Sequence, residues 1–334
     1  MQALVIEGPG LARVAEAGIP VPGNGQVVVD IHRVGICGTD AELFTGELPY
    51  FAQGKSRFPL RPGHEWCGVV SAVGADVDVS WLGVRVTGDT MLGCGRCRRC
   101  RSGKWNVCAD RDEIGITGWP GALADKLLVP EWSLHRLPAT VDDTAGALVE
   151  PGGSAQRAVA AAEAGPGTRV LVCGPGTIGL LAVAFAVAAG AEVDVLAVDD
   201  SRRELAERFG AAGYWTAAHR PPGSYEAVVD CTNSPYVPAA AVELVEPGGR
   251  VVYIGVSPAP SRVDTRDLVL GDITAVGILG ASAGLAATIG HYADGRVRPG
   301  ALARVLVGLD RAADALAGRI SAAPGTKIHI DPRL

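Results

Sequence analysis

Four cysteines fall within the stretch GCGRCRRCRSGKWNVC, residues 93–108, spaced C-x2-C-x2-C-x7-C from Cys94 through Cys97 and Cys100 to Cys108. In a reducing compartment, clustered cysteines are more often metal ligands than disulfide partners. Four thiolates complete the tetrahedral coordination of zinc and leave no open position for water or substrate. The spacing therefore predicts a structural zinc site that holds a lobe of the chain. Free thiols and a redox switch are the alternatives.

A second group of ligand-type side chains is spread over the segments GICGTDAE, RPGHEWCG and ALVEPGG. These segments contain Cys37, Thr39, Asp40, Glu42, His64, Glu65 and Glu150. Each residue also has a common structural role, such as a core cysteine, a hydrogen-bonded histidine or a glutamate at a helix start. Because 27 residues separate Cys37 from His64 and 86 separate His64 from Glu150, the spacing alone does not bring them together.

The segment VLVCGPGTIG, residues 170–179, has the form G-x-G-x-x-G, with Gly174, Gly176 and Gly179 after an apolar run and before a helical pattern. In a dinucleotide site the first glycine allows a tight turn, the second lets the backbone approach the pyrophosphate, and the third allows close helix–strand packing. Thr177 and Ile178, which open the helix, are expected beside the phosphates, where backbone N–H groups bind anions. The alternative is a unit of the same fold that binds no dinucleotide.

An acidic residue is expected about 20 residues after the glycines, and Asp199 ends the next apolar run. Its carboxylate would accept hydrogen bonds from the ribose hydroxyls and repel a 2′-phosphate, which favours NAD over NADP. Arg202 and Arg203 follow closely and could bind a phosphate, which weakens this preference.

The elements around these residues change character near residue 150. Earlier apolar runs are short and broken by glycine and proline, which is typical of strands and turns. Later runs alternate between strand and helix, which predicts an α/β fold with a parallel sheet covered on both faces. The predicted strands are 168–174, 192–199, 226–232 and 250–256, and the predicted helices are 177–190, 201–211 and 235–249. A closing strand is expected at KIHI, residues 327–330.

The chain has 334 residues, of which 48% are hydrophobic and 20% are charged, with a net charge of −6. This length favours two domains, and the negative charge gives no basis for binding nucleic acid or an anionic membrane. The longest apolar run, residues 177–191, is too short to span a bilayer. The N-terminus shows no secretory signal. We expect a cytoplasmic protein.

Taken in order, these motifs resemble the zinc-dependent branch of the medium-chain dehydrogenase/reductase family. The resemblance rests on GICGTD, GHEWCGVV, the four-cysteine lobe, GALADKLLVP, VEPGG and GPGTIG, and it covers nearly the whole chain. It implies a GroES-like, mostly β catalytic domain over 1–150, a doubly wound parallel-sheet Rossmann domain over 151–284, and a return to the catalytic domain over 285–334. It also implies a homodimer or homotetramer. The apolar strands RVVYIGV and ITAVGILG are candidates for the contact, and ordinary interior strands are the alternative.

The resemblance further implies that Cys37, His64 and Glu150 bind a catalytic zinc, with Glu65 beside it as an alternate ligand. Asp40 would orient His64, and Thr39 would contact the substrate oxygen and begin proton removal. Relatives often have a histidine at the position of Glu42, so Glu42, water or another group takes over the proton exit. Four further strand-end residues match cofactor-lining positions, namely Cys231, Thr232, Val256 and Ile278.

Two other departures from the family bear on the site. Gly152 and Gly153 follow Glu150 where relatives often have larger residues, so we expect a widened or reshaped region near the metal. In the adenosine region the arginine is Arg203, one position earlier than in many relatives. Gln156 and Arg157 are further polar candidates near the metal.

The sequence thus predicts a zinc-dependent oxidoreductase that interconverts a secondary alcohol and a ketone with NAD, and with NADP as the less favoured cofactor. A small polyhydroxylated alcohol is the expected substrate, namely a polyol, sugar, cyclitol or aminocyclitol. L-threonine or a small diol is the alternative within the enzyme class. Two other interpretations remain. One is a zinc-binding structural remnant without catalysis, and the other is an enzyme that retains its NAD through an internally balanced reaction.

Overall fold

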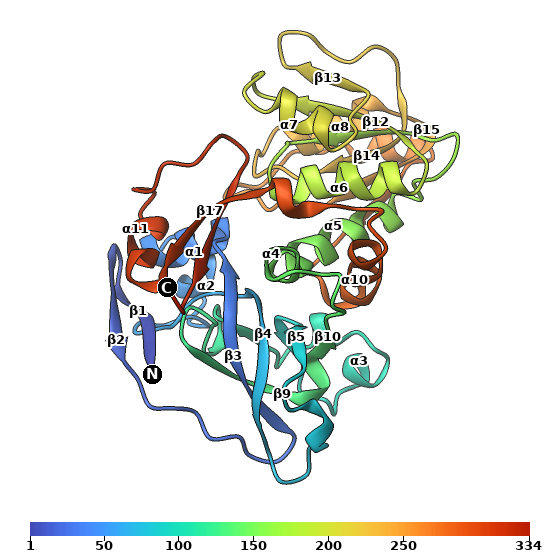
Figure 1. Ribbon diagram of the computed structural model, residues 1–334. Helices are drawn as coiled ribbons and strands as arrows, with labels where there is room; N and C mark the ends of the chain where they lie inside the picture. Colours follow the sequence, from blue (N-terminus) through green and yellow to red (C-terminus); the bar gives the residue numbers. More distant parts are fainter. The chain divides into compact units, whose positions relative to one another are not determined.

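The computed structural model describes all 334 residues, and the chain divides into two compact units (Figure 1). Unit 1 contains Met1–Glu150, Tyr292–Asp294 and Pro299–Leu334, and unit 2 contains Pro151–His291 and Gly295–Arg298. The predicted return to the first unit at residue 285 differs from this division. Helix α10 (Leu285–Ala293) stays with unit 2 for most of its length, because Leu285 lies against Gly153 and His291 packs edge-on against Phe185.

Unit 1 is built on a seven-stranded sheet in which the last strand of the chain pairs with an early one. The path runs β10-β5-β4-β3-β18-β17, and β9 pairs with β3. The bounds are β3 Gln26–Gly35, β4 Glu65–Val73, β5 Arg85–Gly88, β9 Lys126–Pro130, β10 Leu134–Arg136, β17 Ala303–Gly308 and β18 Lys327–Asp331. Apolar positions of β3, β4, β9 and β18 form the core of this unit with the inward side of β1. The predicted strand at KIHI is β18.

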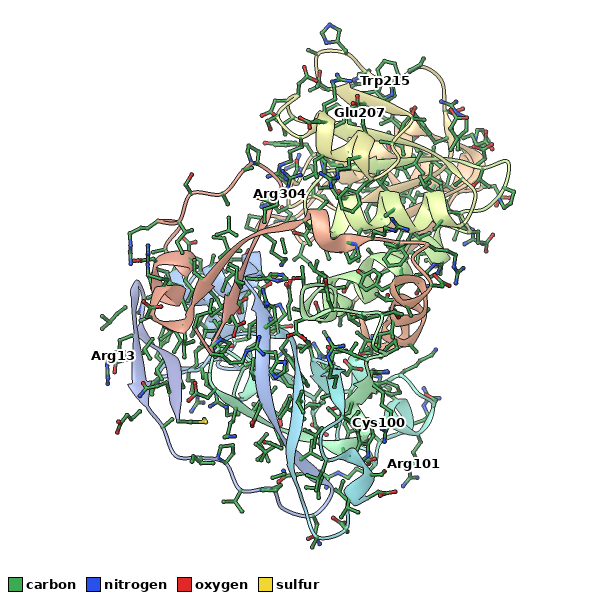
Figure 2. The ribbon with its side chains drawn as sticks, in the orientation of Figure 1. Arg13, Cys100, Arg101, Glu207, Trp215 and Arg304 are labelled. Atoms are coloured by element: carbon green, nitrogen blue, oxygen red, sulfur yellow. The ribbon has the colours of Figure 1, made fainter.

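Two small sheets and several short helices complete unit 1. The sheets are the hairpin β1 (Gln2–Gly8) with β2 (Leu11–Glu16), and β6 (Met91–Leu92), β7 (Asp112–Ile114) and β8 (Gly118–Trp119). The helices are α1 (Gly38–Thr45), α2 (Pro49–Ala52), α3 (Arg98–Arg101), α4 (Asp143–Ala147) and α11 (Ala312–Leu316). Helix α3 lies in the loop of residues 93–108, hereafter the cysteine lobe, where Cys100 and Arg101 are labelled in Figure 2.

Unit 2 is a six-stranded parallel sheet in the order β13-β12-β11-β14-β15-β16. The bounds are β11 Arg169–Cys173, β12 Glu192–Ala197, β13 Gly213–Thr216, β14 Tyr225–Asp230, β15 Val245–Tyr253 and β16 Thr274–Gly277. Renumbered along the chain, this order is the doubly wound 3-2-1-4-5-6 arrangement. The predicted fold class is confirmed. Ligands of such sheets bind at the carboxyl ends of the strands where the order reverses, here between β11 and β14.

Helix α5 (Val149–Ala161) precedes the first strand of unit 2. Four further helices connect successive strands of the sheet, namely α6 (Thr177–Ala188), α7 (Arg203–Arg208), α8 (Val237–Leu244) and α9 (Thr265–Leu270). Helix α6 is buried on most sides, as its uniformly apolar sequence predicts. The predicted helix 235–249 is shorter, since α8 ends at Leu244 and Val245 begins β15 opposite Tyr225; Pro247 has no N–H with which to continue a helix. None of the helices has the length and apolar character needed to cross a membrane.

Candidate metal centres and cofactor site

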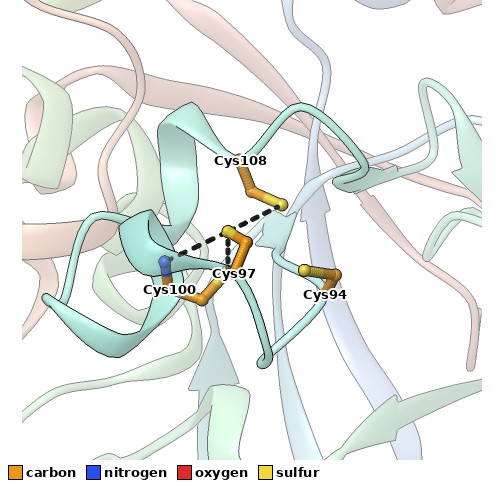
Figure 3. A group of neighbouring side chains, drawn as sticks. All are labelled: Cys94, Cys97, Cys100 and Cys108. Atoms are coloured by element: carbon orange, nitrogen blue, oxygen red, sulfur yellow. Dashed lines mark hydrogen bonds between the residues drawn. The ribbon is translucent and has the colours of Figure 1, made fainter.

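The cysteine lobe brings its four thiols into one group. Their sulfur atoms lie within 4.8 Å of one another, and all four cysteines are free of disulfides. Cys97 Sγ is 3.5 Å from Cys100 Sγ and 3.8 Å from Cys108 Sγ (Figure 3). A tetrahedron with zinc–sulfur bonds of about 2.3 Å has sulfur separations of about 3.8 Å. The geometry therefore fits a zinc ion held by four thiolates.

Local structure explains why the thiols converge. Cys97 caps α3, and its sulfur accepts a hydrogen bond from the Cys100 amide. Gly95 and Gly103 have left-handed backbone conformations, with φ of 71° and 75°, and turn the chain on either side of the helix. Hydrogen bonds from the N–H groups of Arg96 and Cys97 lower the pKa of Cys94 to about 6, which favours the thiolate that a metal requires.

A second compact group contains Cys37, His64 and Glu65, whose ligand atoms also lie within 4.8 Å of one another. The sheet explains this arrangement. Strands β3 and β4 are antiparallel, and Gly35 at the end of β3 lies opposite Glu65 at the start of β4. Cys37 leaves β3 two residues later as the N-cap of α1, and His64 directly precedes β4. A cysteine and a histidine separated by 27 residues thus meet at one end of a strand pair.

Asp40 connects the two segments of this group. It is fully buried, and its carboxylate accepts hydrogen bonds from the amides of Cys37 (2.9 Å) and Gly63 (3.1 Å). His64 Nδ1 lies 3.5 Å from Asp40 Oδ1, which leaves Nε2 as the free ligand atom. Burial alone would raise the pKa of Asp40, but His64 and the two amides outweigh it and lower that pKa. This is the usual carboxylate–histidine arrangement of metal sites.

Sequence reasoning missed Lys327, which is buried beside the group. Its ammonium donates to Glu65 Oε1 at 2.6 Å and to the carbonyl of Ile36 at 3.0 Å. Glu65 Oε2 also lies close to this ammonium, in an ion pair, but makes no hydrogen bond of ordinary geometry. Burial alone would lower the pKa of Lys327, but Glu65 outweighs it and raises that pKa. A single lysine in the apolar pattern of the closing strand was the only signal in the sequence.

Glu150 lies outside the compact group. It is in the first turn of α5, and burial raises its pKa to about 7, with Glu65 and Asp89 adding to this effect and His64 opposing it. It is therefore within electrostatic reach of the group. The structure places Glu65, and not Glu150, closest to Cys37 and His64.

Thr39 and Glu42 both lie on α1, three residues apart, and so on one face of the helix. Thr39 is half-buried and Glu42 is exposed. Partial burial, with the neighbouring Glu47, raises the pKa of Glu42. The two side chains thus lead from Thr39, which is half-buried near Cys37, to Glu42, which is exposed to solvent.

The glycine turn of unit 2 has the close approaches that its sequence predicts. Gly174 has φ of 89°, and a Cβ there would lie 2.7 Å from Thr232 Cγ2. A Cβ on Gly179 would lie 2.0 Å from the Gly174 carbonyl oxygen. Gly176 is the N-cap of α6, so the helix N-terminus with Thr177 and Ile178 opens at this turn. The turn fits a pyrophosphate.

The other predicted cofactor residues lie at carboxyl ends of strands. The Cys231 amide donates to the Cys173 carbonyl, next to the turn. Thr232 donates through its amide and hydroxyl to Asp230. Val256 is 80% exposed, and the Ile278 amide donates to the Tyr253 carbonyl.

The charged residues in the loop after β12 each make a different contact. Asp199 accepts a hydrogen bond from the Ser201 amide and is exposed. Arg203 pairs with Asp200 at 2.7 Å and stacks on the Tyr214 ring. Arg202 donates to the carbonyl of Pro175 in the glycine turn. Arg202, and not Arg203, is therefore the arginine in contact with the turn.

The structure shows what the segment after Glu150 contacts. A Cβ on Gly153 would lie 2.9 Å from Ala281 Cβ and 3.2 Å from Leu285 Cδ2. Gly153 thus permits close packing inside unit 2 and does not open space. Arg157 donates to the carbonyls of Leu279 and Gly280, so its guanidinium holds the segment after β16. Gln156 is half-buried in the same helix.

His329 is a further buried titratable residue that sequence reasoning did not identify. It lies on β18, is 1% exposed, and neither ring nitrogen has a hydrogen-bond partner. Burial lowers its pKa to about 3, and the positive charges of Lys327 and Arg33 add to this effect. It is neutral at physiological pH.

Comparison with known proteins agrees with this geometry. Residues 23–139 match the alcohol dehydrogenase GroES-like domain, and residues 177–290 match the zinc-binding dehydrogenase domain. The chain is 31% identical over 272 residues to a zinc-type alcohol dehydrogenase-like protein of Escherichia coli, covering 78% of each chain. The chain belongs to the zinc-dependent medium-chain dehydrogenase/reductase family. It is an oxidoreductase of the class that acts on CH–OH donors.

Two further relatives show how the family varies. L-threonine 3-dehydrogenase from Coxiella burnetii is 28% identical over 276 residues, with 79% of this chain and 80% of the relative covered. A zinc-binding dehydrogenase from Sinorhizobium meliloti, solved with NADP bound, superposes with a TM-score of 0.91 at 29% identity and covers 99% of both chains. The family match therefore leaves the substrate and the choice between NAD and NADP open.

Proposed function

We propose that this member of the family interconverts a secondary alcohol and a ketone at a zinc centre formed by Cys37 and His64. The observation that carries the proposal is the compact Cys37–His64–Glu65 group with buried Asp40 behind it. One thiolate, one imidazole and one carboxylate leave a fourth position open, as catalytic zinc sites do. Glu65 is the carboxylate within the compact group, and Glu150 is the second acid that we propose for the same position.

The protein's own residues bind, orient and move a proton. Zinc, when bound, polarises the alcohol and lowers its pKa. Asp40 keeps the His64 ring in one orientation by facing Nδ1. The Thr39 hydroxyl accepts the proton of the substrate as it donates its own proton onward, and Glu42, three residues further along α1 and exposed, passes that proton to solvent. The glycine turn would hold the dinucleotide, which when bound would supply the hydride acceptor.

We expect a polyhydroxylated substrate, namely a polyol, sugar or cyclitol. The chain is only 5% aromatic, which gives little support for an aryl-alcohol site, and Glu42 provides a polar group on the Thr39 face. The 28% identity to L-threonine 3-dehydrogenase favours threonine as the second candidate.

The test is oxidation of a panel of polyols, cyclitols, aminocyclitols, sugars, small diols and threonine, followed by the absorbance of reduced nicotinamide. Activity with one polyhydroxylated group, lost in Cys37→Ala and retained in Arg157→Lys, is the expected result. Activity with threonine alone would replace the polyol proposal. No activity in a protein that holds one zinc per chain would favour a structural remnant, whereas NAD that stays bound through purification would favour an internally balanced reaction.

NAD is the proposed cofactor because the Asp199 carboxylate lies in the exposed loop after β12, where it would repel a 2′-phosphate. Asp199→Asn should raise the affinity for NADP while Asp200→Asn, in the neighbouring salt bridge, should not. Binding of each cofactor is measured by calorimetry, without a substrate. Equal binding of NAD and NADP by the unmodified protein would contradict the preference.

We also propose a homodimer through the edge of the unit 2 sheet. Strand β16 pairs only with β15, and the nearby α9 exposes Val269 (79%) and Leu270 (86%). An unpaired edge beside exposed apolar side chains is a typical pairing surface. Ala275→Lys on β16 should give a monomer in sedimentation, whereas Lys at the exposed Val21 should not change the mass.

A further inference from the structure

The search for groups that the proposed function leaves unused leads to the segment between β5 and the cysteine lobe. Strand β5 pairs with β4 only at Val86 and Arg85. Beyond them, two threonine hydroxyls continue the connection to β4. Thr87 Oγ1 donates to the carbonyl of Trp66 at 2.7 Å, and Thr90 Oγ1 donates to the carbonyl of His64 at 3.3 Å. Both threonines are buried, so the backbone at His64 is held by this segment.

Asp89, between these contacts, fixes the segment in place. Its side chain is buried, its amide donates to the Ser133 carbonyl, and Oδ1 accepts from the Met91 amide at 3.0 Å. Oδ2 accepts from Trp105 Nε1 at 2.7 Å. A hydrogen bond to a buried carboxylate is among the stronger ones in proteins, so the indole N–H is a main anchor of Asp89.

Trp105 belongs to the cysteine lobe. Its carbonyl accepts the amide of Cys108, one of the four cysteines. Gly93 lies against it, since a Cβ there would come within 2.6 Å of Trp105 Cβ and 2.7 Å of Cys100 Sγ. The position of the indole is therefore set by the same backbone that gathers the four thiols.

These contacts form one continuous series from the lobe through Trp105, Asp89 and Thr90 to His64. We propose that Trp105 is the positioning residue through which the metal-bound cysteine lobe fixes His64 as a ligand of the second metal centre. The inference rests on the metal role proposed for His64. The cysteine lobe would then have a specific role, since an ordered lobe would hold His64 in the position in which it binds metal.

The perturbation is Trp105→Phe, which keeps a smaller aromatic ring in the lobe and removes the indole N–H that reaches Asp89. Losing a group that orients a metal ligand typically weakens metal binding by 10- to 100-fold. Because Trp105 acts through two intermediate residues, we expect a loss of about 10-fold, the lower end of that range. The matched control is Trp132→Phe, since Trp132 packs edge-on against Trp105 in the same region.

The measurement uses full-length protein loaded with cadmium-113, whose NMR resonance depends on the number of thiolate ligands and so separates the four-cysteine site from the His64 site. Titration with a chelator gives the cadmium affinity of each site. Trp105→Phe should weaken the His64 site alone and leave the four-cysteine resonance unchanged. A general loss of structure would weaken both sites, and this result would overturn the proposal.

A double-variant comparison makes the test specific. Cys97→Ser disrupts the lobe and should weaken the His64 site at least as much as Trp105→Phe does. The double variant should then be no weaker than Cys97→Ser, because both changes break the same series of contacts. Additive losses, or an unchanged His64 site in Trp105→Phe, would refute the inference. If Trp105→Phe does not fold, Thr90→Val tests the last contact of the series in its place.

The outcomes separate this inference from the proposed function. If the unmodified protein binds no cadmium at Cys37 and His64, the proposed zinc centre fails. If it binds cadmium there with the same affinity in Trp105→Phe, the centre stands and only the positioning role of Trp105 is lost.

Discussion

Replacing Lys327 by methionine tests the most deeply buried ion pair beside the candidate centre. The side chains of Lys327 and Glu65 are 4% and 2% exposed. Methionine fills a similar volume but leaves the Glu65 carboxylate without its ammonium partner. Removing one member of a buried pair typically costs about 3–5 kcal/mol, because the remaining charge stays in a poorly solvating interior. At about 1.4 kcal/mol per factor of ten, this is a loss of about two to four orders of magnitude in the folding equilibrium.

The control is Lys126→Met. Lys126 pairs with Asp30 on the partly exposed surface of the same sheet, with side chains 27% and 45% exposed. Surface pairs of this kind contribute at most about 1 kcal/mol. The double variant Glu65→Gln with Lys327→Met removes both charges and should recover most of the loss.

Tryptophan fluorescence during urea unfolding reports on the relevant unit. Five of the six tryptophans, Trp66, Trp81, Trp105, Trp119 and Trp132, lie in unit 1, and only Trp215 lies in unit 2 (Figure 2). A Trp215→Phe background removes the remaining signal. Unfolding at two zinc concentrations separates weaker metal binding from the lost ion pair, because only the former depends on zinc. A loss below about 1 kcal/mol in Lys327→Met, equal to the control, would refute the reasoning.

The remaining predictions concern pH, the glycine turn and metal removal. The pKa of His329 in the folded protein is about 3, below its ordinary value, so the unfolded chain binds the extra proton. The free energy of unfolding should therefore fall by about 1.4 kcal/mol per pH unit as the pH drops below about 6.5. His329→Leu should flatten this dependence in urea unfolding at several pH values, and an unchanged slope would exclude His329 as its source. Gly179→Ala should weaken NAD binding, as measured by calorimetry. The control Gly165→Ala should not, because a Cβ at Gly165 meets nothing within 4 Å, and equal effects of the two variants would contradict the packing argument. Removal of zinc by a chelator should make residues 93–108 sensitive to trypsin, which cleaves after their solvent-exposed arginines. Mass spectrometry identifies the cleavage sites, and equal cleavage with zinc present would argue against a structural site.

The sequence was most informative where the chemistry is local. The four cysteines and the turn from Gly174 to Gly179 lie within short segments, so spacing alone determines which atoms can meet. The doubly wound sheet of unit 2 follows from the alternation of apolar runs, which the strand order confirms. Local spacing also has limits: the residue that contacts the turn is Arg202, because side-chain direction, and not sequence distance, decides which arginine reaches the Pro175 carbonyl.

The second metal centre depends on pairing between distant strands, which no local pattern encodes. That Gly35 lies opposite Glu65 is a matter of sheet register. The same register places Glu65 beside Cys37 and His64, whereas Glu150 lies on α5. The resemblance to the family implied the candidate ligands, but it did not point to Lys327 or to the contact of Trp105 with Asp89, because each of these residues has an ordinary structural role when considered alone.

The two centres therefore differ in what must fold before each can form. The cysteine lobe takes all its ligands from one short loop and needs only the turns at Gly95 and Gly103. The His64 centre needs β3, β4 and the final strand β18, since Lys327 holds the carbonyl of Ile36 next to Cys37 and the carboxylate of Glu65 next to His64. Because β18 pairs with β3 across most of the sequence, Lys327 reaches these groups only after the two strands have paired. The strand thus supports the candidate site although it holds none of the candidate ligands.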